Sequence, residues 1–152
     1  MRRVPNPTPK KHPIMTIIRT VSPKYFAPVT HKCLAANGLL QELKFDVQFK
    51  RLKQSERDAL IEANALKRKQ IEQDTENGIN TNTAALEEIK ELLRTYACGW
   101  KGVQEEDKTE VPFSHEALFD LCEDYSGLLV SVANAFWESF NPTTAAHLAT
   151  KN

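Results

Sequence analysis

The segment between Phe113 and Pro142 most constrains the fold, because it specifies both the start and the end of a helical region. Ser114 can accept a hydrogen bond from the backbone N–H groups that a helix leaves unpaired at its start. Glu116 lies in the first turn, where the helix dipole favours negative charge. Phe113 and Leu118 have the spacing of a hydrophobic staple, and Pro142 cannot continue a helix. The segment therefore predicts helical structure that begins after Ser114 and stops before Pro142.

Apolar residues follow helical spacing through this segment, with one interruption at Ser126 and Gly127. Burying a large apolar side chain contributes about 1.5–3 kcal/mol, so such a cluster can anchor a small domain. The apolar positions are Leu118, Leu121 and Cys122 before the interruption, and Leu128, Leu129, Val132, Ala133, Phe136, Trp137 and Phe140 after it.

Asn37 and Gly38 predict a β-hairpin, because an Asn-Gly pair tolerates the positive φ angles of a two-residue turn. We expect the strands over residues 26–34 and 39–52. In the second strand apolar and polar residues alternate, as they do where one face is buried and the other is wet. A lone hairpin is marginally stable in water, so helices should cover the apolar face. The apolar positions of the second strand are Leu43, Phe45, Val47 and Phe49.

Two further helices are predicted between the hairpin and Trp100. Ser55 is placed to cap the first helix, and the polar residues 74–83 form a loop after it. The second helix begins near Thr83, and Gly99 is placed to end it. Its apolar stripe consists of Leu86, Ile89, Leu92, Leu93 and Tyr96.

A turn at Trp100 and Gly102 and an acidic loop over residues 104–110 connect this helix to the one that Ser114 caps. The order of elements predicts an α+β fold that is mostly helical, with an N-terminal antiparallel β-hairpin packed against about four helices. A chain of 152 residues corresponds to one domain. We place this single domain at residues 25–141 and a C-terminal tail at 142–152.

Residues 1–24 form a basic arm that is rich in proline. They contain six basic residues and no acidic one, and four prolines within the first 13 residues preclude a helix or a central strand there. Met15 is a second candidate for the first translated residue. A solvated tail is the favoured interpretation of the arm, and contact with nucleic acid or an acidic partner is the alternative. A short strand before Pro23 is predicted from Ile14, Ile17 and Ile18.

The chain as a whole has no net charge, with 20 basic and 20 acidic residues, so general attraction to nucleic acid or anionic membranes is not indicated. Beyond the arm, 14 basic residues stand against 20 acidic ones, a net charge of minus six. No apolar run reaches the roughly 18 residues of a membrane-spanning helix, and the basic N-terminus lacks the apolar core of a secretory signal. Three widely spaced cysteines, Cys33, Cys98 and Cys122, favour reduced thiols over a disulfide framework.

No group of residues has the spacing of a catalytic or metal site. His31 and Cys33 could supply two metal ligands, but a zinc site needs more, and no second pair has suitable spacing. Residues 104–110 lack the alternating ligands, central glycine and distal glutamate of a calcium loop. The sequence has neither a nucleophile–base constellation nor a glycine-rich phosphate loop. We therefore expect no enzymatic activity and no cofactor.

Several short motifs follow one another along the chain. The first are Pro28-Val29-Thr30, Phe49-Lys50-Arg51-Leu52 and Ser55-Glu56. The later ones are the Trp-x-Gly turn, the acidic loop, Pro112-Phe113-Ser114 before a short helix, and a helix that ends in aromatic residues. In this order and spacing the motifs resemble the tail assembly chaperones of long-tailed bacteriophages, whose genes lie beside the tape-measure gene. The resemblance spans roughly residues 25–140.

The resemblance implies a non-catalytic chaperone of a temperate or defective siphophage. Such a chaperone binds the aggregation-prone tape-measure protein in the host cytoplasm, helps to recruit tail-tube subunits, and is absent from the mature virion. We expect amphipathic helices of the partner to pack on an apolar stripe, and core packing is the alternative role for the same side chains. The candidate contacts are Trp100, Phe113, Leu128, Val132, Phe136, Trp137 and Phe140.

Two other functions stay open, a small nucleic-acid-binding or regulatory module that uses the basic arm and a structural tail component. The first predicts binding that weakens steeply with salt, and the second predicts that the protein is found in purified particles. Assembly into a homo-oligomer is open as well.

Overall fold

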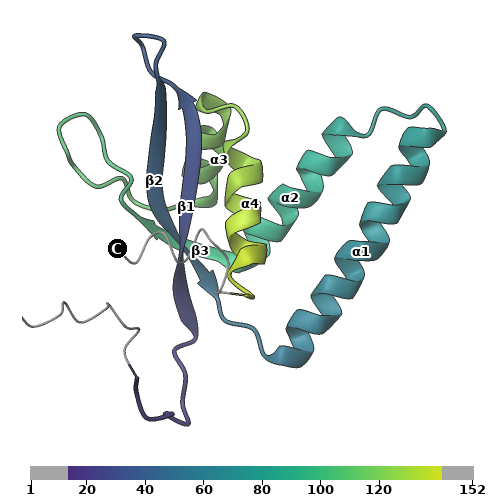
Figure 1. The fold of residues 1–152 in the computed structure, drawn as a ribbon, viewed down its shortest axis with the longest axis horizontal. Coiled ribbons are helices and arrows are strands. Elements are labelled where there is room, and N and C mark those ends of the chain that lie inside the picture. The colour runs from purple at the N-terminus through teal and green to yellow at the C-terminus, as the bar shows by residue number, and fades with distance from the viewer. Residues whose placement is uncertain (1–13, 142–152) are drawn as a thin grey trace, which may run out of the picture.

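The computed structural model of the chain describes residues 14–141 (Figure 1). The rest of the predicted arm, up to residue 13, and the predicted tail, from residue 142, lie outside them. A three-stranded antiparallel sheet and four helices make an α+β fold, which confirms the predicted class. None of the described helices is long and apolar enough to cross a membrane. In chain order the elements are β1 (Lys24–Leu34), β2 (Leu40–Lys50), α1 (Gln54–Glu76), α2 (Asn82–Tyr96), β3 (Ala97–Lys101), α3 (His115–Asp124) and α4 (Leu128–Glu138).

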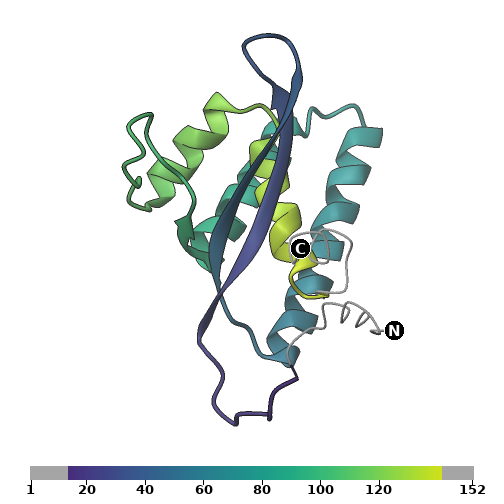
Figure 2. The ribbon, with the colours of Figure 1, turned by 60° about the vertical axis from the view of Figure 1, so that its left-hand side comes forward.

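The elements form layers, which two views of the ribbon show (Figures 1 and 2). α4 lies against the sheet, and α1 lies beyond α4 on the side away from the sheet. Fully buried apolar residues come from every element except α1. We call the sheet together with α2, α3 and α4 the body of the domain, and α1 is a separate outer layer on it.

The predicted hairpin is confirmed, but its turn differs from the expected one. β1 and β2 pair from Lys24 opposite Lys50 to Leu34 opposite Leu40. Of the Asn-Gly pair only Gly38 has a positive φ, at 81°, whereas a two-residue type I′ turn would need positive φ at both positions. The backbone N–H of Ala35 donates to the Leu39 carbonyl at 2.8 Å, so the loop consists of three residues, 36–38, with glycine at its single left-handed position.

The third strand, β3, was not predicted from the sequence. It pairs with β2, placing Lys101 opposite Asp46 and Gly99 opposite Gln48. The expected end of the preceding helix at Gly99 is therefore wrong, because α2 already ends at Tyr96. Gly99 lies close to the Gln48 side chain: a Cβ there would come within 2.6 Å of its terminal oxygen and 3.2 Å of its Cβ, so the glutamine would have to move. Residues 97–101 form a strand because they pair with β2. Apolar and polar residues do not alternate along these five positions, so their sequence alone gives no strand signal.

The helix boundaries in the C-terminal half follow the sequence signals. Ser114 Oγ accepts a hydrogen bond from the backbone N–H of Ala117 at 2.9 Å, which confirms the predicted cap. The predicted interruption is also confirmed, because Gly127 adopts a left-handed φ of 82° between α3 and α4. Left-handed φ is easily reached by glycine alone. α4 ends at Glu138, before the predicted stop at Pro142, a residue outside the described range.

Two predictions nearer the N-terminus are wrong. Ser55 does not cap a helix but lies inside α1, which begins after Lys53. The backbone N–H of Lys53 instead donates to the Glu56 carboxylate at 3.1 Å, so the contact at this helix start comes from a glutamate inside the first turn. Residues 14–23 form no strand, because no described strand lies beside them to complete their backbone hydrogen bonds. The side chains expected in that strand are exposed: Ile14, Ile17 and Ile18.

The centre of the core is the ring of Phe136, whose exposed fraction is 0%. Its centroid lies 5.0 Å from that of Phe49 on β2 and 5.4 Å from that of Tyr96 on α2. Within the same C-terminal segment, Trp137 and Phe140 place their rings 5.2 and 5.0 Å away. Phe136 thereby joins the sheet, α2 and α4 in one aromatic cluster.

Replacing Ser114 with alanine should lower the free energy of unfolding by about 1 kcal/mol, because the Ala117 N–H loses its partner at the start of α3. Urea denaturation followed by circular dichroism measures this change. Ser126→Ala is the matched control, since that serine is exposed and lies between α3 and α4. Equal losses in the two variants would show that the cap contributes nothing.

Candidate helix-binding groove

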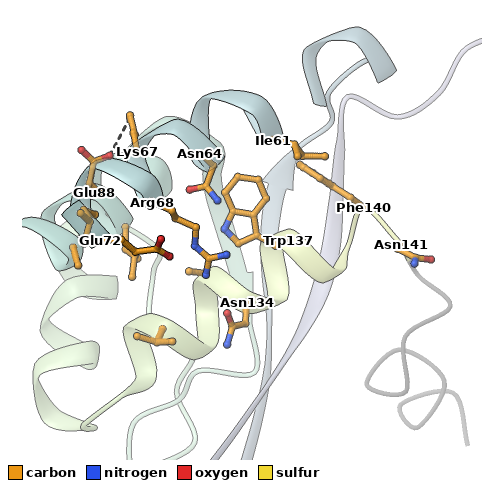
Figure 3. A pocket seen from close by; sticks show the side chains of 15 residues that line it. Ile61, Asn64, Lys67, Arg68, Glu72, Glu88, Asn134, Trp137, Phe140 and Asn141 are labelled. Atoms are coloured by element: carbon orange, nitrogen blue, oxygen red, sulfur yellow. Dashed lines mark ion pairs between the residues drawn. The ribbon is translucent and has the colours of Figure 1, made fainter. Parts of the chain in front are cut away.

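A groove of about 860 Å³ runs between α1 on one side and α2 and α4 on the other (Figure 3). Phe140, which follows the end of α4 in the chain, also lines the groove. Apolar grooves between helices are surfaces on which amphipathic helices dock. The apolar lining residues of the helices are Ile61 and Ile71 of α1, Ala85 and Ile89 of α2, and Val130, Ala133 and Trp137 of α4.

α1 packs on the rest of the domain through a narrow half-buried stripe that is mostly polar. None of its 23 residues is fully buried. Only two of the five half-buried positions carry apolar side chains, and a fully buried apolar side chain contributes about 1.5–3 kcal/mol. Packing therefore holds α1 to the body less strongly than it holds α4, six of whose residues are buried. The half-buried positions of α1 are Arg57, Leu60, Asn64, Ile71 and Asp74.

Two charged contacts join α1 to the body. The Lys67 ammonium lies 3.0 Å from the Glu88 carboxylate of α2, and both side chains are exposed. An exposed ion pair contributes about 0–1 kcal/mol. The Arg57 guanidinium lies 4.9 Å from the centroid of the Phe140 ring, a cation–π contact of about 0.5–1 kcal/mol. These contacts are too weak to compensate for the missing apolar packing.

Polar side chains of α1 cover an aromatic surface. Asn64 and Arg68 point toward Trp137 and Asn134 of α4 (Figure 3). The indole of Trp137 packs edge-on against the Phe140 ring, 5.7 Å between centroids, and remains half-buried. A partner with an apolar face would match this surface better than α1 does, because apolar surface gains free energy when apolar groups replace water.

The structure divides the seven predicted contact residues into three groups. Leu128, Val132 and Phe136 are buried in the core and have no surface for a partner in this conformation. Trp137 and Phe140 are half-buried and line the groove.

The remaining two predicted residues lie away from the groove lining. Trp100 donates from its indole N–H to the Val111 carbonyl at 2.7 Å. Its ring packs edge-on against that of Phe113, 5.3 Å between centroids. This pair connects β3 to the segment before α3, which is a structural role.

Sequence reasoning missed several groove residues, among them Val130 of α4, an apolar side chain that is 43% exposed. A signal for Val130 was present in the sequence. Three apolar residues in a row, Leu128 to Val130, span about 200° of a helix, so they cannot all face one core. The α1 contributors Ile61 and Ile71 gave no comparable signal, because the apolar stripe of α1 is thin.

The two histidines among residues 14–141 are hydrogen-bonded within the fold. His31 Nδ1 and Ser131 Oγ are hydrogen-bonded at 2.9 Å, and His115 Nε2 is hydrogen-bonded to the Ala97 carbonyl at 2.8 Å. Burial raises the pKa of the Cys122 thiol to about 11, so it is protonated at neutral pH. Within residues 14–141, no three or more His, Cys, Asp or Glu side chains are placed to hold a metal ion.

Comparison of the chain with protein-family models, with curated proteins and with solved structures gives no match.

Proposed function

We propose that the protein is a non-catalytic tail assembly chaperone of a long-tailed bacteriophage, and that the groove binds amphipathic helices of the tape-measure protein. In this proposal the chaperone acts in the host cytoplasm, keeps the tape-measure protein soluble, helps to recruit tail-tube subunits, and is absent from the mature virion. The order of sequence motifs over roughly residues 25–140 supports the biological setting. The groove supports the mode of binding.

One observation carries the proposed mode of binding. The wall that α2 and α4 contribute to the groove is largely apolar and aromatic, yet α1, the helix that forms the opposite wall, has no buried residue. A tape-measure helix with apolar side chains at positions i, i+3 or i+4, and i+7 would bury Trp137 and Val130 more completely. Both signs of charge line the groove, through Lys67 and Arg68 and through Glu72 and Glu88. A partner helix with charges of both signs beside its apolar face is therefore suited to it.

Co-expression with the tape-measure protein tests the function. The soluble fraction of the tape-measure protein should rise when this chain is present, because its apolar helices are then covered. An unrelated aggregation-prone helical protein is the control for specificity. No gain in tape-measure solubility would contradict the proposal, and an equal gain for both proteins would contradict its specificity. Purified particles should lack the chain.

Replacing Lys67 with glutamate should tighten tape-measure binding by up to about fivefold. The change turns the attraction between residue 67 and Glu88 into repulsion, which lowers the free energy that holds α1 against α2 by about 1 kcal/mol. A partner that has to displace α1 then binds with that much more free energy. Titration of a labelled tape-measure segment by fluorescence anisotropy measures the dissociation constant. In the double variant Lys67→Glu with Glu88→Lys the ion pair is reversed, so affinity should return toward the wild-type value. Weaker binding by the single variant, restored in the double variant, would instead make α1 a wall of the binding site.

A further inference from the structure

Residues 14–21 carry apolar side chains that nothing in the described chain covers. Ile14 and Ile17 are 96% and 94% exposed, and Met15, Ile18 and Val21 are also exposed. Isoleucine and valine favour strands. The segment joins the sheet at Pro23, whose carbonyl accepts a hydrogen bond from the backbone N–H of Arg51 at 2.8 Å. The apolar side chains of residues 14–21 could therefore be buried only against a surface that they do not contact in this structure.

The upper half of β2 offers an unpaired edge. β3 pairs with β2 only from Asp46 onward, and Gly102 lies against the backbone of Phe45, so residues 40–44 have a backbone neighbour on one side alone. The Ala35 N–H donates to the Leu39 carbonyl, and bonded pairs alternate along an antiparallel ladder. The N–H groups that point away from β1 are consequently those of Leu40, Glu42 and Lys44.

Exposed leucines lie at the same end of the hairpin. Leu34, Leu39 and Leu40 surround the tip, which projects beyond the helices (Figure 1). The outer edge of β1 is a poorer template, since Pro28 lies opposite Asp46 and has no N–H to donate there. The free edge of β2 therefore combines backbone donors with an adjacent apolar surface.

The segment cannot dock in full on the free edge of its own chain. Lys24 pairs with Lys50, and Thr30 pairs with Lys44, where the free edge begins. This offset is about 20 Å along the strand, and a strand beyond β2 lies about 10 Å to the side of β1. The three residues from Lys24 back to Val21 reach at most about 10 Å. A second copy of the chain has no such restriction.

Opposite charges also favour docking of residues 14–21 of one copy on the β2 edge of a second copy. Residues 14–24 contain Arg19 and Lys24 and no acidic residue. The loop between β3 and α3 stands beside β2 (Figure 1) and holds Glu105, Glu106, Asp107 and Glu110 against one lysine. Its Glu110 shares a surface hollow with Lys44 and Phe45 of β2. Hydrogen bonds from Thr109 lower the pKa of the Asp107 carboxyl further below its ordinary value.

We propose that residues 14–21 of one copy add a strand to the free edge of β2, residues 40–44, in a second copy, with their apolar side chains on its tip leucines. Reciprocal exchange between two copies closes a dimer, and one-way exchange extends a chain of copies. The inference does not depend on the proposed chaperone function, because it uses another surface of the domain.

Sedimentation of the full chain tests this exchange. The wild-type protein should form dimers or larger species. The arm variant Ile17→Asp with Ile18→Asp should be monomeric, and so should the edge variant Glu42→Pro, for which Glu42→Ala is the control that keeps the N–H. Leu40→Asp, at an exposed tip position, is a second edge variant in case the proline disturbs folding. Circular dichroism checks that each variant is folded.

Mixing the two kinds of monomer gives the decisive result. The arm variant retains an intact β2 edge and the edge variant retains an intact arm, so together they should form a one-to-one complex and nothing larger. A wild-type chain that is monomeric at high concentration, or variants that assemble like wild type, would overturn the proposal. So would folded variants that fail to form the mixed complex.

Discussion

Replacing Val130 with aspartate should abolish the ability of the protein to keep its tape-measure partner soluble, while the domain stays folded. Val130 is 43% exposed and lines the groove. It is the third residue of α4, where the helix dipole favours a carboxylate, so folding should not suffer. An apolar partner helix would bury that carboxylate without a counter-charge, which costs several kcal/mol. A loss above about 2 kcal/mol corresponds to a dissociation constant raised more than about 30-fold.

The matched control is Leu86→Asp. Leu86 lies on α2 and is 44% exposed, so the same charge replaces an equally exposed apolar side chain outside the groove lining. Co-expression and anisotropy titration should show near wild-type binding for Leu86→Asp and none for Val130→Asp. Equal binding by the two variants would exclude the groove as the contact surface, and equal loss would point to a general effect of surface charge.

Replacing Phe136 with alanine should have the largest effect on stability, a loss of about 3–5 kcal/mol in the free energy of unfolding. The ring is fully buried and touches aromatic rings from β2, from α2 and from α4 itself. Its removal leaves a cavity between these elements, which cannot close without moving the sheet relative to α4. The free energy of unfolding of a domain of this size is about 5–15 kcal/mol in total, so the substitution would remove a large fraction of it.

Urea denaturation followed by circular dichroism measures this loss, and Val130→Ala is the control on the same helix. The control should change stability by about 0.5 kcal/mol or less, because Val130 is partly exposed. Binding by Phe136→Ala should fall only in proportion to the folded fraction. A loss below about 1 kcal/mol would show that Phe136 is not at the centre of the core.

Part of the candidate site could be predicted from the sequence. Trp137 and Phe140 were expected to contact a partner, and both line the groove. The neighbouring Phe136 carried the same expectation and is buried in the core. Adjacent helical positions point about 100° apart, so one turns toward Phe49 on β2 while the other turns toward α1. Only the position of the sheet relative to α4 decides that Phe136 is buried and Trp137 lines the groove.

The sequence by itself determined the features that a few neighbouring residues control. Ser114 starts α3, Gly127 separates α3 from α4, and the alternation up to Phe49 makes β2 a half-buried strand. Each signal acts within one or two turns or along one strand.

The tertiary structure alone decided the pairing of β3 with β2, the three-residue turn at Gly38, and the position of α1 over the groove. These features depend on partners far away in the chain. β3 is a strand because the edge of β2 is there to bond it. α1 is an outer layer because β1 and β2 take the sheet side of α4, which leaves α1 only the opposite side.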